Sequence, residues 1–259
     1  MTTTTNTWLN KVPEVTLAFW IIKIMSTTVG ETGADFLAFN IHWGLGVTTV
    51  VMCGLLLVTL LMQLRTTRHT PWLYWLSVVL VSIVGTQITD LLTDKLGVSL
   101  YASTLGFSLL LGATFLLWYR AERSLSIHHI TTRRRELFYW AAILCTFALG
   151  TAAGDLISEE VGIGFLPGTA LFGGLIALIY SLWRGGANPV LAFWLAYILT
   201  RPLGASLGDL LTQAHTEGGL GFDTMQVSAL FLMVIVALVT VAQLTNNSTS
   251  GESAVDEYQ

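Results

Sequence analysis

The sequence predicts an all-α integral membrane protein with eight transmembrane helices, arranged as four parallel two-helix repeats that are pseudo-symmetric about the membrane normal. Two observations support this fold class. First, 53% of the 259 residues are hydrophobic and only 11% are charged, against about 25% charged residues in an average soluble domain, and the mean hydropathy is +0.68. Second, one motif occurs four times along the chain.

The motif reads aromatic residue, Trp, nine residues, Gly, four residues, Asp and two apolar residues. Its tryptophans are Trp20, Trp75, Trp140 and Trp194, its glycines are Gly30, Gly85, Gly150 and Gly204, and its aspartates are Asp35, Asp90, Asp155 and Asp209. Aspartate within a membrane segment is uncommon. Four copies with the same spacing therefore indicate an internal repeat.

Each motif segment is followed by an apolar run that contains no charge. These runs cover residues 47–64, 101–119, 167–183 and 227–244. Each can cross ~30 Å of hydrocarbon as a helix that rises about 1.5 Å per residue. The chain therefore divides into an N-terminal tail (1–14), repeats at 15–64, 72–119, 137–183 and 189–244, a basic link (120–136) and a disordered tail (245–259).

The four motifs, together with the stretch TTVGE in the first copy, resemble a bacterial family of integral membrane proteins built from four two-helix repeats of unknown function. The resemblance covers residues 20–244 and implies the eight-helix architecture. It implies no activity, so the function has to be argued from the residues themselves.

The basic residues predict the orientation of the chain in the membrane. The N-terminus and the links between repeats carry Lys11, Arg65, Arg68, Arg120, Arg123, Arg133, Arg134, Arg135 and Arg184. The loops on the other side carry only Lys95. Because cytoplasmic loops are enriched in Lys and Arg, we expect a multi-pass protein of the bacterial inner membrane with both termini in the cytoplasm.

Small residues predict how the motif helices pack. Each motif glycine shares a helix face with the residue four positions later, in the pairs Gly30/Ala34, Gly85/Thr89, Gly150/Gly154 and Gly204/Gly208. Two small residues at this spacing let helix backbones approach closely in lipid. We therefore expect the motif helices in the centre of the bundle and the uncharged helices outside.

Polar side chains on the motif helices are the candidates for an ion or substrate site. They are Glu31, Asp35, Asp90, Asp155, Asp209, Thr27, Thr28, Thr86 and Thr151. Carboxylates and hydroxyls suit protons, alkali ions and hard divalent ions better than Zn²⁺ or Cu⁺. If a metal binds, its candidate ligands are Glu31, Asp35, Asp90 and Asp155. Lys23 and Arg201 are the candidate counterions, Lys23 toward Glu31 and Arg201 toward Asp209.

The excess of carboxylates over bases inside the helices favours a path for a cation. We expect a transporter or channel-like protein whose partners are the lipid bilayer and a small cation, without nucleic acid and without a cofactor other than a bound metal cation. Two alternatives stay open: a membrane sensor or scaffold with a structural polar network, and an intramembrane enzyme that uses Asp155 and Asp209. No enzymatic signature is present, so we expect no enzyme, and the oligomeric state stays open.

Overall fold

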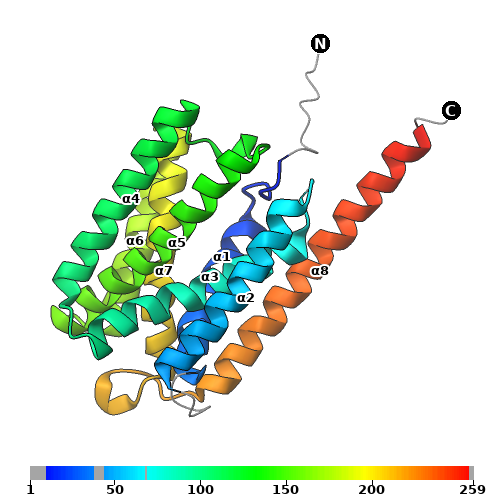
Figure 1. Cartoon of the computed structure of the whole chain (residues 1–259). Coiled ribbons are helices and arrows are strands. Elements are labelled where there is room, and N and C mark those ends of the chain that lie inside the picture. Colours follow the sequence, from blue (N-terminus) through cyan, green and yellow to red (C-terminus); the bar gives the residue numbers. More distant parts are fainter. Residues whose placement is uncertain (1–9, 38–43, 68, 257–259) are drawn as a thin grey trace.

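The computed structural model describes residues 10–37, 44–67 and 69–256. These residues form eight α-helices, whose arrangement is shown in Figure 1. They are α1 (Leu17–Asp35), α2 (Leu45–Arg65), α3 (Pro71–Asp90), α4 (Leu100–Glu122), α5 (Arg133–Asp155), α6 (Phe165–Arg184), α7 (Pro189–Thr212) and α8 (Thr224–Asp256). Most of the expected N-terminal tail, Arg68 and residues 257–259 lie outside the described residues.

Local sequence explains where the motif helices begin. The Thr16 side chain accepts a hydrogen bond from the Phe19 backbone N–H at the start of α1, and Thr132 does the same for Arg135 at the start of α5. Helices α3 and α7 begin with a proline. A proline is tolerated in the first helical turn because the N–H that it lacks would have no partner there.

The four motif helices surround one common axis. Helix α1 packs against α3 and α7, and α5 packs against the same two helices, so that α1, α3, α5 and α7 form a closed ring. Each remaining helix packs outside this ring against the motif helix that follows it in the chain: α2 on α3, α4 on α5 and α6 on α7. Helix α8 completes the arrangement by packing on α1.

The helices differ in burial as their sequences predict. The apolar spans of α3, α5 and α7 are 61%, 67% and 50% buried, whereas those of α2, α4, α6 and α8 are 22%, 11%, 17% and 17% buried. The outer helices present leucine and valine side chains to their surroundings. A bundle with this apolar exterior is that of a multi-pass membrane protein.

Seven of the described helices are long and apolar enough to cross a membrane. Helix α1 is not among the seven, because Lys23, Glu31 and its threonines make its sequence more polar. It lies within the inner ring, where polar side chains meet protein instead of lipid.

The chain changes its winding directly after three of the motif aspartates. A π-helical turn follows Asp35 at residues 36–37, Asp90 at η3 (Leu91–Lys95) and Asp155 at η5 (Leu156–Glu160). In contrast, α7 continues as an α-helix beyond Asp209 to Thr212. π-helical turns are rare in proteins, and those that occur are often found at functional sites. The spacing of the motif did not predict them.

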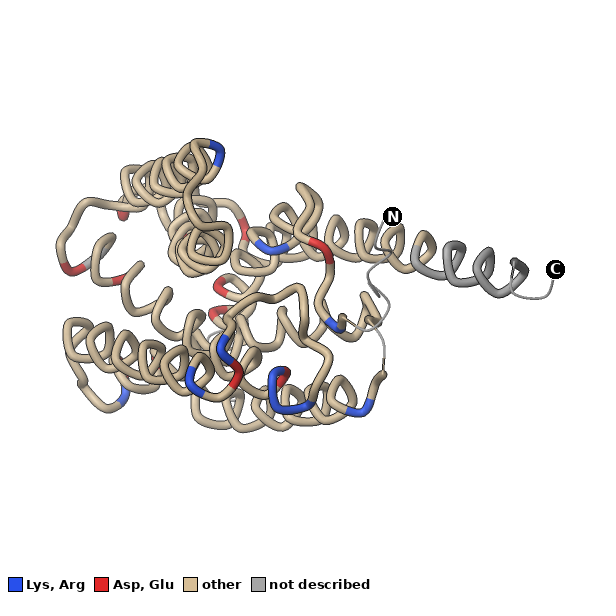
Figure 2. The backbone as a smooth tube through the Cα atoms, turned by 90° about the horizontal axis from the view of Figure 1, so that it is seen from above, with Lys and Arg blue, Asp and Glu red and all other residues tan. Residues whose placement is uncertain are grey.

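Basic residues gather at the end of the bundle where the motif helices begin. Arg65 ends α2, Arg133 begins α5 and Arg184 ends α6, and Figure 2 looks onto this end. Lys95 closes η3 at the opposite end. Helix α8 also runs on past residue 245, where we expected the disordered tail to start. The sequence contains no proline after residue 245, and proline is the residue that interrupts helices most strongly.

Candidate functional site

The motif helices contact one another through their motif glycines. A Cβ atom added to a motif glycine would overlap one residue of the neighbouring motif helix: Ser82 for Gly30, Phe147 for Gly85, Arg201 for Gly150 and Thr27 for Gly204. Each of these four contacting residues lies seven positions after the tryptophan of its own motif. One interface is thus repeated around the ring, and it brings the helix backbones close enough for their polar side chains to meet.

The second glycines of the pairs make looser contacts. A Cβ on Gly154 would lie 3.4 Å from Pro202, and one on Gly208 would lie 3.4 Å from the Cβ of Glu31. These are ordinary van der Waals distances. In these two pairs the first glycine, Gly150 or Gly204, is therefore the point of closer approach.

A buried ion pair links three of the motif helices. Arg201 of α7 is fully buried, and its Nη2 donates a hydrogen bond to Glu31 Oε2 of α1 at 2.5 Å. The same Nη2 donates to the Thr86 hydroxyl of α3, and Nη1 donates to the Thr27 carbonyl at 3.0 Å. The Thr86 hydroxyl lies 3.3 Å from Glu31 Oε2. Breaking such a pair costs about 3–5 kcal/mol, because one charge is left buried without compensation.

This pairing differs from the one expected for Arg201 and Lys23. The structure pairs Arg201 with Glu31 of a neighbouring helix, whereas we expected Asp209 of the same helix. The reason is direction: Arg201 packs against Gly150 of α5 and reaches into the ring, where Glu31 lies. Lys23 was expected to pair with Glu31, and that carboxylate is instead held by Arg201.

Lys23 lies fully buried near the axis among aromatic rings. Its Nζ is 3.9 Å from the ring centroid of Phe147 and 4.3 Å from that of Tyr197. Among the described residues it has no hydrogen-bond partner. Cation–π contact offsets part of the cost of burying an ammonium group, but a buried amine without hydrogen bonds remains unusual.

The four motif aspartates do not share one environment. Asp35, Asp90 and Asp155 each end their α-helix and are half-buried, whereas Asp209 lies inside α7 and is buried. The Asp90 carboxylate interacts electrostatically with Glu31, Asp35 and Asp94. Carboxylates therefore gather where α1 and α3 lie side by side.

The expected metal ligands Glu31, Asp35, Asp90 and Asp155 are not assembled into a metal site. Within the described part of the chain, no three His, Cys, Asp or Glu side chains are grouped so that they could hold a metal ion. The position of α5 explains why Asp155 lies apart from the other three candidates. It packs against α3 and α7 and stands across the ring from α1, which carries Glu31 and Asp35.

Most of the candidate hydroxyls are used within their own helices. Thr28 donates to the Ile24 carbonyl at 3.2 Å, and Thr151 donates to the Phe147 carbonyl at 3.2 Å. Thr27 donates to the Ile24 carbonyl and also crosses to the Thr200 carbonyl of α7 at 3.1 Å. Only Thr86 of this set has a hydrogen bond to a carboxylate among the contacts of the described residues.

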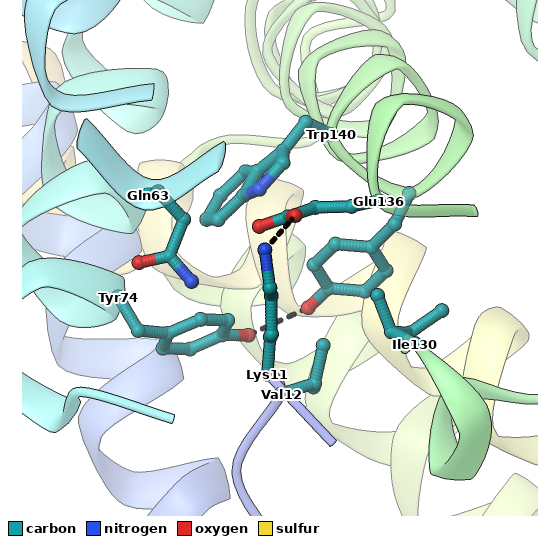
Figure 3. A pocket seen from close by; sticks show the side chains of 8 residues that line it. Lys11, Val12, Gln63, Tyr74, Ile130, Glu136 and Trp140 are labelled. Atoms are coloured by element: carbon teal, nitrogen blue, oxygen red, sulfur yellow. Dashed lines mark hydrogen bonds and ion pairs between the residues drawn. The ribbon is translucent and has the colours of Figure 1, made fainter. Parts of the chain in front are cut away.

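The end of the axis where the motif helices begin holds a second buried ion pair, which the sequence pattern did not predict. Lys11 Nζ donates to Glu136 Oε2 at 2.6 Å, and both side chains are buried. They line a small pocket together with Gln63, Tyr74 and Trp140 (Figure 3). Lys11 belongs to a segment before α1 that was expected to be a plain tail, and Glu136 follows a run of three arginines, so neither residue stood out.

The segment that carries Lys11 is fixed to the loop before α5 and to the link before α3. Asn10 Nδ2 donates to the Ile127 carbonyl, and Asn10 Oδ1 accepts from the Ile130 backbone N–H. His69 Nδ1 lies 3.1 Å from the Lys11 carbonyl oxygen. Burial lowers the pKa of His69, and the hydrogen bond to Lys11 opposes part of that decrease.

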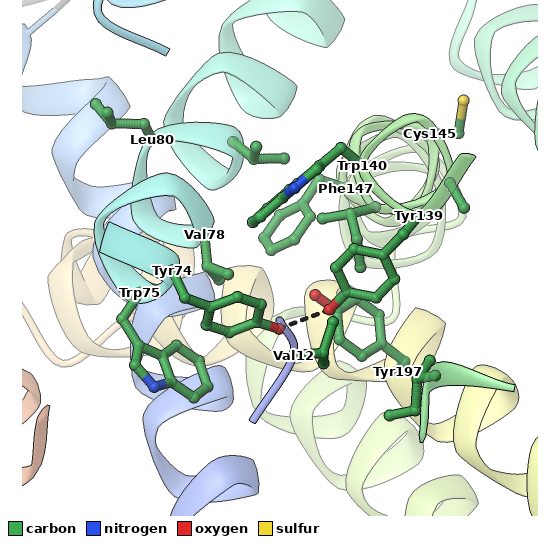
Figure 4. Close-up of a cluster of buried hydrophobic side chains, with 14 of the residues drawn as sticks. Val12, Tyr74, Trp75, Val78, Leu80, Tyr139, Trp140, Cys145, Phe147 and Tyr197 are labelled. Carbon is green, nitrogen blue, oxygen red and sulfur yellow. Dashed lines mark hydrogen bonds between the residues drawn. The ribbon is translucent and has the colours of Figure 1, made fainter. Parts of the chain in front are cut away.

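Three tyrosines continue the polar groups from this pocket toward Lys23. The hydroxyls of Tyr74 and Tyr139 are hydrogen-bonded at 2.6 Å (Figure 4). The Tyr197 hydroxyl lies beside that of Tyr139 without a hydrogen bond of good geometry, and the Tyr197 ring contacts Lys23. Polar side chains thus follow the axis from Glu136, through the tyrosines and Lys23, to Arg201, Glu31 and Asp90.

Fold and site together define a class: a multi-pass α-helical membrane protein of four tandem repeats that encloses buried charged side chains. Residues 18–69, 73–124, 138–185 and 192–248 match the family described as Repeat of Unknown Function (DUF347). The chain belongs to this family, as its four motifs predicted. Comparison with curated proteins and with solved structures found no match.

Proposed function

We propose that the protein is a transporter of the bacterial inner membrane that moves a small cation along the axis of α1, α3, α5 and α7. One observation carries the proposal: Lys23, Glu31 and Arg201 are buried at the centre of a bundle whose exterior is apolar. A charged side chain within a membrane costs about 2.5–3.5 kcal/mol even on the most lenient scale. Such residues usually mark an ion path or a proton relay.

The proposed transporter crosses the membrane eight times. Helix α1 crosses within the ring, where its polar residues avoid lipid, and the other seven described helices are apolar enough to span. Because each repeat contains two crossings, the repeats are parallel and related by an axis along the membrane normal. The arginine-rich end faces the cytoplasm, and the end with Asp35, Asp90 and Asp94 faces outward, where its negative charge attracts cations.

Glu31 is the residue at which transport would be controlled. Arg201 and an incoming cation compete for the same carboxylate, since Glu31 accepts a hydrogen bond from Arg201 at 2.5 Å. With the ion pair formed, the ring is closed at this level. A cation that binds at Glu31 releases Arg201 and loosens the contact between α1 and α7.

A membrane sensor or scaffold is the second candidate. It is favoured by the hydrogen bonds of Thr28 and Thr151, which are satisfied within their own helices, and by the pairing of Glu31 with Arg201. In that case the polar groups specify which helices pack together, and no ion moves.

Flux through purified protein in proteoliposomes separates the two candidates. We expect the wild type to carry a cation current down an imposed gradient. Glu31→Gln and Asp90→Asn should each reduce this current about tenfold or more, because each removes a negative charge that attracts the cation on its path. Asp223→Asn is the matched control: Asp223 is exposed, and its side chain accepts a hydrogen bond from the Gln226 backbone N–H that asparagine can also accept.

The control should keep the wild-type current. If the wild type carries no proton, alkali or divalent cation above empty vesicles, the transport proposal is wrong and the scaffold is the better account. Glu31→Gln and Asp90→Asn proteins that remain folded and conduct like the wild type would show that the ion does not pass these acids.

A further inference from the structure

Lys23 is the residue that the cation path leaves unexplained. A structural ammonium group is normally held by carboxylates or carbonyl oxygens. Lys23 has none of these as a hydrogen-bond partner among the described residues, although it is fully buried. It faces the rings of Phe147 and Tyr197, and the like charge of Arg201 acts on it.

We propose that the transported cation is the proton and that Lys23 is the side chain that binds and releases it in the middle of the axis. This inference rests on the proposed transport function and narrows it to one ion. A lysine amine has a single lone pair, so in its neutral form it binds one proton and cannot surround a metal ion with several ligands.

The packing around Lys23 fits a proton better than a larger ion. The side chains of Phe147 and Tyr197 fill the space beside its Nζ. Helix α3 packs closely against Phe147, since a Cβ atom added to Gly85 would lie only 2.8 Å from the Phe147 Cβ. A proton passes between side chains without an open pore, whereas a hydrated metal ion needs room and oxygen ligands. The aromatic faces also stabilise the ammonium form once a proton has bound.

Groups that can exchange protons lie on both sides of Lys23. On the outer side is the Glu31 carboxyl, which contacts Arg201 and Thr86. On the inner side are the hydroxyls of Tyr197, Tyr139 and Tyr74, which lead to the pocket of Glu136 and Lys11 (Figures 3 and 4). The described side chains of α8 carry no charge, and α3 contributes only Asp90, at its outer end.

The transfer step balances in atoms and charge. The O–H bond of a protonated Glu31 breaks, and an N–H bond forms on the neutral amine of Lys23. The proton crosses through intervening water molecules, because the two residues lie about 12 Å apart along α1. Glu31 becomes a carboxylate that Arg201 holds, and Lys23 becomes an ammonium group, while Arg201 stays charged throughout. The net charge of the three side chains is unchanged, because the transfer forms one negative and one positive charge from two neutral groups.

Substitutions of Lys23 test this role by separating charge from proton exchange. Lys23→Arg keeps a permanent positive charge over the two rings but cannot release a proton, and Lys23→Met keeps the apolar stem without the amine. With a pH-sensitive dye inside proteoliposomes, we expect both variants to lose proton flux by about tenfold or more. Lys95→Met and Lys95→Arg, at an exposed lysine, should keep wild-type flux.

Tyr197→Phe gives a second test that does not depend on the folding of a Lys23 variant. It keeps the ring under Lys23 and removes a hydroxyl that forms no good hydrogen bond, so the protein should stay folded while proton flux falls several-fold. Proton flux at the wild-type level in folded Lys23→Arg or in Tyr197→Phe would overturn the proposal.

Ion selectivity distinguishes this inference from the proposed function. A wild type that carries Na⁺, K⁺ or a divalent cation but no protons leaves the transport function standing and refutes the role of Lys23. A wild type that carries no cation at all refutes both. Proton flux that vanishes in the Lys23 variants and persists in the Lys95 variants supports both.

Discussion

At the scale of single residues, the ion pair of Arg201 and Glu31 decides how charge is held inside the bundle. Arg201 contacts the side chains of Glu31 and Thr86 and the backbone of Thr27, so its guanidinium connects α7 with α1 and α3. Its Nε has no partner among the described residues. The guanidinium is therefore incompletely satisfied, and most of its stabilisation comes from Glu31.

We predict a strong coupling between these two residues. Arg201→Met should lower the free energy of unfolding by about 3–5 kcal/mol, because it leaves the Glu31 carboxylate buried without a counterion. Adding Glu31→Gln should recover much of that loss, because the remaining amide is neutral. The measurement is thermal or denaturant unfolding in detergent of the two single variants and the double variant. Strictly additive losses would contradict a direct interaction.

At the scale of the helices, the motif glycines determine how closely neighbours approach. Gly30 accommodates Ser82 and Gly204 accommodates Thr27, with contacts too close for any side chain on the glycine. Glycine is the least favourable residue in a helix interior apart from proline, by about 1 kcal/mol relative to alanine. Its use at these points is explained by the interface and not by helix formation.

Alanine substitutions should therefore have opposite effects at different glycines. Gly30→Ala should lower the unfolding temperature by several degrees, because Ser82 would have to move away, while Gly112→Ala in α4 should keep or raise it, because nothing lies within 4 Å of that position. Thermal unfolding of the two variants in the same detergent is the measurement.

Adding Ser82→Gly to Gly30→Ala should restore much of the lost stability, because it removes the side chain that the new methyl group meets. Equal stability of Gly30→Ala and Gly112→Ala, or no effect of the second substitution, would mean that the glycine contact is not needed.

At the scale of the whole molecule, the bundle is a ring of four inner helices with one outer helix on each, closed by the packing of α8 on α1. Because all motif helices begin at the same end, the arginine-rich links and the N-terminal segment with Lys11 meet there. The acidic residues Asp35, Asp90 and Asp94 lie at the other end. The two ends of the axis therefore differ in charge.

Sidedness can be measured with single cysteines in a Cys53→Ala, Cys145→Ala background. We expect His128→Cys, in the exposed link before α5, to react with an impermeant maleimide only after the membrane is opened. Thr216→Cys, in the exposed turn after α7, should react in intact cells. The bias of arginines toward the first side is the reason. Reaction of both cysteines from the same side would rule out the eight-helix topology.

The sequence by itself determined the repeat, the helices and the division into inner and outer helices. These properties are local: the spacing of Trp20, Gly30 and Asp35 recurs in each copy, and helices without charge can face lipid wherever they lie. It also identified Gly30 and its counterparts as contact points, since small residues four positions apart act alike in any membrane helix pair.

Only the tertiary structure decided which charges meet. Arg201 and Glu31 are 170 positions apart, and Lys11 and Glu136 are 125 apart, so no spacing along one helix could pair them. We expected Arg201 to pair with Asp209 because the sequence shows which residues are neighbours along one helix. It does not show which residues face each other across the ring. Packing sets which helix lies alongside which, and how far a side chain reaches past a facing glycine. The same packing placed Lys23 between two aromatic rings.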